Sequence, residues 1–105
     1  KIEMYDLAMV IGVLIHIAPK HLPIAYENIY RATRRYILIG EYYSRQPEEV
    51  SYRGYKNKLF KRDFAGEMLD KYTDLRLVDY GFFYHKDESS NLDDITWFLM
   101  EKADI

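Results

Sequence analysis

The chain has 105 residues, enough for one small domain with a hydrophobic core and too few for two domains. Hydrophobic residues make up 49% of it, which excludes a disordered chain, and the net charge of -2 favours no particular partner. There is no cysteine, so a disulfide scaffold, a thiolate zinc site and a cysteine nucleophile are excluded, and a cytoplasmic location is expected. The longest apolar stretch, residues 7–18, is too short for a membrane span.

The first predicted element is a buried strand over residues 5–11. Leu7 to Ile11 form an almost continuous apolar run, which is typical of a strand in a parallel sheet that helices cover on both faces. A loop over residues 12–20 follows. Because ligands bind beyond the carboxyl ends of parallel strands, we expect the start of this loop to lie at a binding site.

A helix is predicted around Pro23, which is tolerated in the first turn because its missing N–H has no intrahelical partner there. Apolar residues repeat at helical spacing through Thr33, and Arg31, Arg34 and Arg35 are expected near the carboxyl end of the helix, where positive charge suits the helix dipole. A second strand is predicted over residues 36–43. Strand, helix and strand with short connections form a right-handed crossover unit.

Residues 46–61 are predicted to form a polar, irregular loop. Asp63 then begins a second helix, and two more strands are predicted over residues 75–84 and 95–102. The roughly ten residues between these strands leave no room for a crossover helix, so the strands must be antiparallel neighbours. The chain is therefore predicted to be an α/β fold of order β-α-β-α-β-β that closes with an antiparallel hairpin.

Several chemically capable side chains fall at the carboxyl ends of the first two predicted strands. His16 could serve as a base or orient an acceptor because imidazole titrates near neutral pH, or it could hydrogen-bond the backbone of a tight turn. Strand alternation sends Glu41 and Tyr43 to one side and Tyr42 to the other, and the alternative for both tyrosines is packing against helices. The histidine spacing fits no metal site.

The predicted loop before Asp63 is basic and rich in aromatic residues. It could clamp a carboxylate, a phosphate or a nucleotide-sugar. It could also track a nucleic acid, with its aromatic residues stacked on bases, or it could be a solvated surface loop. Its basic residues are Arg53, Lys56, Lys58, Lys61 and Arg62.

The sequence resembles the carboxyl-terminal half of class I S-adenosylmethionine-dependent methyltransferases. Asp6-Leu-Ala-Met-Val-Ile-Gly-Val-Leu-Ile-His16 resembles the fourth strand of that family and its following turn, and residues 36–43 resemble the fifth. Residues 75–84 and 94–101 resemble the closing hairpin. More narrowly, Leu59-Phe-Lys-Arg-Asp-Phe-Ala-Gly-Glu-Met-Leu-Asp70 is similar to small methylases associated with pseudaminic acid biosynthesis, as are residues 52–55 and 93–98.

This resemblance implies half of a doubly wound, Rossmann-like sheet and methyl transfer from S-adenosylmethionine to a sugar-like small molecule, in a nonulosonic acid pathway. It implies that Ile11, Gly12 and Val13 approach the cofactor, and that His16 and Glu41 orient or deprotonate the acceptor. The residues expected to bind the acceptor are Tyr42, Tyr43, Arg53, Tyr55 and Lys61.

The family's glycine-rich loop and ribose-binding acidic residue have no counterpart in these residues, so we expect a fragment or remnant that does not bind the cofactor tightly alone. The first strand would then have a bare edge, which either a separate amino-terminal half or a second copy would cover. Two other interpretations are a non-catalytic binding or dimerisation module and a nucleic-acid methyltransferase. The net charge of -2 disfavours a nucleic-acid methyltransferase.

Overall fold

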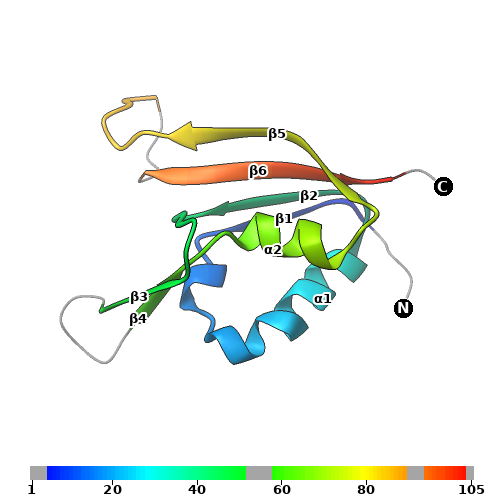
Figure 1. Cartoon of the computed structure of the whole chain (residues 1–105). Helices are drawn as coiled ribbons and strands as arrows, with labels where there is room; N and C mark the ends of the chain where they lie inside the picture. Colours follow the sequence, from blue (N-terminus) through cyan, green and yellow to red (C-terminus); the bar gives the residue numbers. More distant parts are fainter. Residues whose placement is uncertain (1–4, 52–57, 90–93, 104–105) are drawn as a thin grey trace.

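A computed structural model describes residues 5–51, 58–89 and 94–103. In these residues a four-stranded sheet has the spatial order β1-β2-β6-β5, and two further strands form a separate hairpin (Figure 1). The strands of the main sheet are β1 (Tyr5–Ile11), β2 (Thr33–Glu41), β5 (Leu75–Phe83) and β6 (Ile95–Lys102). The hairpin consists of β3 (Glu48–Ser51) and β4 (Lys58–Lys61), and the α-helices are α1 (Leu22–Ala32) and α2 (Phe64–Lys71).

The topology of the main sheet agrees with the prediction from the sequence. β1 and β2 run parallel and are joined by α1, and β6 lies antiparallel between β2 and β5. The predicted α/β class and the closing antiparallel hairpin are therefore confirmed. The last strand, β6, pairs with the second predicted strand, β2.

Both α-helices pack on one face of the main sheet. Met68 of α2 is completely buried against this face, together with Ile37 of β2 and Met100 of β6, in one core that α1 shares. Tyr30 of α1 also stacks on Tyr72, the residue that follows α2, with the ring centroids 4.0 Å apart. In the part of the chain that the structure describes, no helix is long and apolar enough to cross a membrane.

The other face of the main sheet carries no helix within the described ranges (Figure 1). Strand register places Met9, Leu38 and Leu99 side by side on it, and Leu7 and Trp97 occupy the same face one pleat away. We call these five residues the open face. Leu7 is 46% exposed and Met9 is 59% exposed. The prediction that helices cover β1 on both faces is therefore wrong for the described residues, because β1 lies at the edge of the sheet and both helices lie on the opposite face.

The boundary between α1 and β2 lies earlier than the sequence predicts. Arg31 lies in the last turn of α1, as predicted. Thr33, Arg34 and Arg35 belong to the strand, so the expectation is wrong for Arg34 and Arg35. Neighbouring strands provide the reason: the Arg34 Nε lies 2.7 Å from a carboxylate oxygen of Asp6, and the Arg35 Nε lies 2.9 Å from one of Glu101. These cross-strand ion pairs favour the extended conformation over helical periodicity.

The prediction that residues 46–61 form an irregular loop is wrong in part, because this segment contains the strands β3 and β4. β3 and β4 pair with Val50 opposite Leu59, and Leu59 is only 7% exposed in the core. Each of these strands has only four residues, so the alternation of polar and apolar residues is too short to be recognised in the sequence. The start of α2 is as predicted, since the Asp63 carboxylate accepts a hydrogen bond from the Gly66 N–H at 3.0 Å.

Candidate functional site

The chain leaves the carboxyl end of β1 through Gly12 and a short 3₁₀ turn, η1 (Leu14–His16). Gly12 has φ +69, a left-handed conformation that glycine adopts without steric cost. Its N–H still donates to the carbonyl oxygen of Gly40 at 2.8 Å, so the turn begins while β1 is paired with β2. The glycine therefore permits the sharp exit that brings η1 over the end of the sheet.

Glu41, the last residue of β2, holds this turn in place. Its carboxylate accepts hydrogen bonds from the N–H groups of Val13 and Leu14, both at 3.1 Å, and from that of Ile15 at 3.3 Å. The side chain is only 3% exposed. One carboxylate thus satisfies three backbone donors at the start of η1, which would otherwise be buried without partners.

Two opposing effects act on the Glu41 carboxyl. Burial raises its pKa above the ordinary value, because a charge is poorly solvated beneath the turn. The N–H groups of Leu14, Val13 and Ile15 counter this by stabilising the ionised form. Both oxygens accept hydrogen bonds from backbone donors, which gives Glu41 an anchoring role. Its role in orienting or deprotonating an acceptor stays a prediction.

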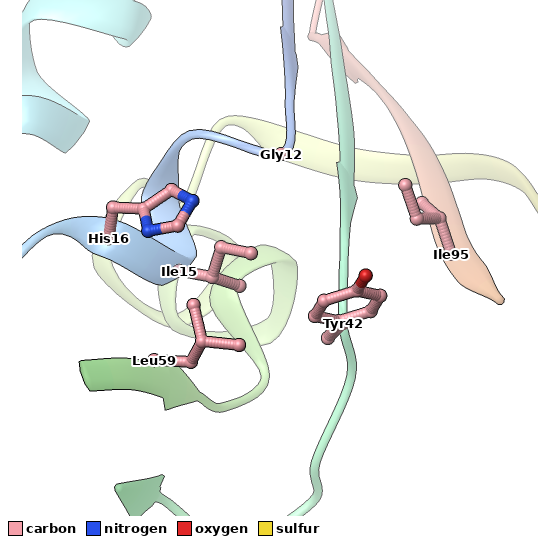
Figure 2. A pocket seen from close by; sticks show the side chains of 6 residues that line it. All are labelled: Gly12, Ile15, His16, Tyr42, Leu59 and Ile95. Atoms are coloured by element: carbon pink, nitrogen blue, oxygen red, sulfur yellow. The ribbon is translucent and has the colours of Figure 1, made fainter. Parts of the chain in front are cut away.

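A hollow of about 180 Å³ opens where β1, β2 and the β3–β4 hairpin meet (Figure 2). Three of its lining residues were candidates from the sequence: Gly12, His16 and Tyr42. Figure 2 shows the His16 imidazole and the Tyr42 ring on opposite sides, with Ile15 and Leu59 between them. The hollow therefore combines two polar side chains with an apolar lining, as small-molecule sites commonly do.

Three lining residues were not predicted from the sequence: Ile15, Leu59 and Ile95. Ile15 lies in the loop that was expected at the site, so position alone could have suggested it. Leu59 reaches the hollow only because the unpredicted hairpin folds against η1, and Ile95 because β6 starts beside the end of β2. These contacts join segments far apart in the sequence, and no local pattern signals them.

The remaining predicted site residues are distributed unevenly. The Lys61 Nζ lies 5.6 Å from the centroid of the Tyr42 ring, so Lys61 stands beside the hollow. Tyr43 lies apart from it, 44% exposed, with its ring centroid 6.0 Å from that of Phe98. Val13 is half exposed and Ile11 is partly buried at the end of β1. Arg53 and Tyr55 lie outside the described residues, and their role stays a prediction.

No group of three or more His, Asp or Glu side chains that could hold a metal ion occurs among the residues described. His16 and Glu41 also do not form a catalytic pair, since the Glu41 carboxylate is turned to the backbone of η1. Chemistry in the hollow would therefore rest on His16 and the Tyr42 hydroxyl.

Replacing Gly12 with alanine tests the shape of this turn. A Cβ at Gly12 would meet no atom within 4 Å, so the expected cost is only that of a left-handed alanine, about 1 kcal/mol of unfolding free energy. Urea unfolding of Gly12→Ala measures it. A loss several times larger would show that the turn has no room for a methyl group, and Gly81→Ala, whose Cβ would lie 2.5 Å from the Trp97 Nε1, illustrates such a crowded site.

Comparison with known proteins gives a match in structure only. No protein-family model and no curated protein matches the sequence. Among solved structures, the chain is similar to 1,6-didemethyltoxoflavin-N1-methyltransferase of Burkholderia thailandensis, determined with bound 1,6-didemethyltoxoflavin and S-adenosylhomocysteine. The TM-score is 0.69 at 15% sequence identity, over 94% of this chain and 44% of that protein. The chain thus has part of a methyltransferase fold and spans less than half of the protein it matches.

Proposed function

We propose that this chain is the acceptor-binding part of an S-adenosylmethionine-dependent methyltransferase that acts on a small molecule. The observation that carries the proposal is the hollow at the carboxyl ends of β1 and β2, where His16 and Tyr42 face each other across an apolar lining. In sheets of this type, ligands bind at that end of the parallel strands. The similarity to part of a methyltransferase fold supports the class of reaction.

The described residues could form only part of a site for the cofactor. Gly12 leaves open space beside the hollow, where the backbone of residues 11–13 could approach a ligand closely. Among the described residues that line the hollow, none carries a carboxylate that could bind ribose hydroxyls, and about 180 Å³ is too small for the whole cofactor. We infer that polypeptide beyond the described residues forms the rest of that site.

The residues of this chain would then act on the acceptor. Bound S-adenosylmethionine supplies an electrophilic methyl group, so the protein mainly has to orient the acceptor and exclude water. His16 would accept a proton or a hydrogen bond from the acceptor, and the Tyr42 hydroxyl would fix its orientation. Ile15 and Leu59 would keep water from the reacting atoms.

We further propose a sugar-like acceptor that carries an acidic group. Lys61 lies next to the Tyr42 ring, where its ammonium could pair with a carboxylate or a phosphate. An acceptor of the nonulosonic acid type, which the resemblance in sequence suggests, has both hydroxyl groups and a carboxylate. A second candidate is a planar heterocycle, favoured by the bound 1,6-didemethyltoxoflavin of the similar structure.

Calorimetric titration with S-adenosylhomocysteine tests the proposal. We expect no strong binding to residues 1–105 alone and clear binding to a longer polypeptide that combines them with a glycine-rich cofactor-binding half. His16→Ala should leave that binding unchanged, because His16 is assigned to the acceptor. Absence of binding in both proteins would contradict methyl transfer and favour a non-catalytic module.

A further inference from the structure

Three aromatic rings form a row on the face of the main sheet that carries the helices, opposite the open face. The ring centroid of Phe98 lies 6.0 Å from that of Tyr43 and 6.3 Å from that of Tyr80. Phe98 pairs with Ile39, a core residue beneath the helices, and with Tyr80 of β5. We call Tyr43, Phe98 and Tyr80 the aromatic row. Tyr43 is 44% and Tyr80 is 64% exposed, so solvent reaches both ends of the row.

The aromatic row lies away from the edge where further polypeptide would continue the sheet. That edge is β1, whereas the row extends toward β5, the strand at the other edge. On the face that carries the row, the helices of this chain are already in place, and α2 begins beside Phe98 with Phe64. Exposed apolar side chains that gather in one place usually mark a binding site.

A shallow groove connects the aromatic row with the hollow. Tyr43 and Phe98 line this groove together with Arg62, and Tyr42 lines both the groove and the hollow. The volume of the groove is only about 10 Å³, the space of a single water molecule, so the groove cannot enclose a ligand. A ligand at this place therefore has to lie against the rings, which favours a planar group.

A cationic side chain stands where the hollow and the groove meet. The Lys61 Nζ lies 5.6 Å from the centroid of the Tyr42 ring, and Lys61 forms no ion pair with a described residue. The Arg62 side chain is only 20% exposed, and its Nε lies 2.5 Å from the Glu67 Oε2. The charge that remains for a ligand is therefore that of Lys61, and it suits an anionic group placed between the hollow and the aromatic row.

We propose that the acceptor is a sugar linked to a nucleotide, with the sugar in the hollow, a phosphate on Lys61 and the base stacked on the aromatic row. The placement of the sugar rests on the proposed function, whereas the contacts of the phosphate and the base do not. Stacking suits every base because each has a π-face, so these contacts select a class of ligand. A single lysine suits few phosphates, and a single-stranded nucleic acid would need a longer positive track.

NMR titration of the chain with uridine diphosphate tests this site. We expect the backbone signals of Tyr43 and Lys61 to shift, and the uracil protons to move upfield because they lie over an aromatic ring. Tyr43→Ala should weaken binding about tenfold, and Tyr43→Phe, which keeps the ring, should bind as the wild type does. The control is Tyr5→Ala: Tyr5 is 63% exposed but lies on β1, so its loss should not change binding.

Comparison of uridine with uridine diphosphate separates the two contacts. Lys61→Gln should weaken binding of uridine diphosphate about tenfold and leave that of uridine unchanged, whereas Tyr43→Ala should weaken both. Absence of binding to the wild type would overturn the proposal, as would binding that Tyr43→Ala leaves intact. Tighter binding of an oligouridylate would overturn it in favour of single-stranded nucleic acid. Failure of S-adenosylhomocysteine to bind the longer polypeptide would overturn only the placement of the sugar.

Discussion

Glu41→Ala is expected to lower the free energy of unfolding by about 3 kcal/mol, the largest loss for any single carboxylate among the described residues. Three backbone N–H groups at the start of η1 lose their protein acceptor, and those of Leu14 and Ile15 are buried. Total stabilities of small domains are only about 5–15 kcal/mol, so the variant should be marginally folded. Urea unfolding followed by circular dichroism measures the loss.

Two variants show whether the carboxylate itself is responsible. Glu41→Gln keeps the size of the side chain and one acceptor oxygen, so its loss should be smaller than that of Glu41→Ala. Glu49→Ala removes a carboxylate that is 54% exposed and paired with Lys58 at 2.7 Å, and it should cost less than about 1 kcal/mol. Equal losses for Glu41→Ala and Glu49→Ala would contradict the anchoring role.

Formate offers a sharper control for the same site. In Glu41→Ala, the N–H groups of residues 13–15 would converge on an empty space, an arrangement that binds small anions. Formate should therefore restore part of the lost stability of Glu41→Ala, and sodium chloride at the same ionic strength should not. An equal response of the wild-type chain would show that formate acts elsewhere.

The anchoring contacts of Glu41 could not be predicted from the sequence. Strand alternation could assign Glu41 and Tyr42 to different sides, but it could not show what Glu41 meets. Its partners lie 26 to 28 positions earlier in the chain, and they are backbone groups, which have no sequence signature. A glutamate at the carboxyl end of a strand therefore resembled a catalytic residue.

Elements with a long, regular pattern were predictable, and those that depend on distant contacts were not. The apolar run of β1 and the short link before β6 were sufficient for the topology. The rule that ligands bind beyond parallel strands selected Gly12, His16 and Tyr42, and all three line the hollow. The β3–β4 hairpin was missed because its stability comes from packing on η1, mainly through Leu59, and not from its own composition.

Leu59→Ala should lower the free energy of unfolding by about 3 kcal/mol, as is usual for a buried leucine. Leu59 is 7% exposed, and β4 packs against η1 through it. The hairpin has only two short strands, which are rarely stable without such support. Loss of this anchor should therefore loosen the hairpin before the main sheet unfolds, and it should open one wall of the hollow.

Amide hydrogen exchange distinguishes this local effect from general destabilisation. In Leu59→Ala, protection should fall most in β3, β4 and η1, while the central strands β2 and β6 keep their rank as the slowest to exchange. Met68→Ala is the matched control: Met68 is completely buried under the main sheet, so its loss should reduce protection throughout the core. A uniform loss of protection in Leu59→Ala would mean that the hairpin is part of the core's cooperative unit. The hollow would then be a fixed feature of the fold, without a wall that can move separately.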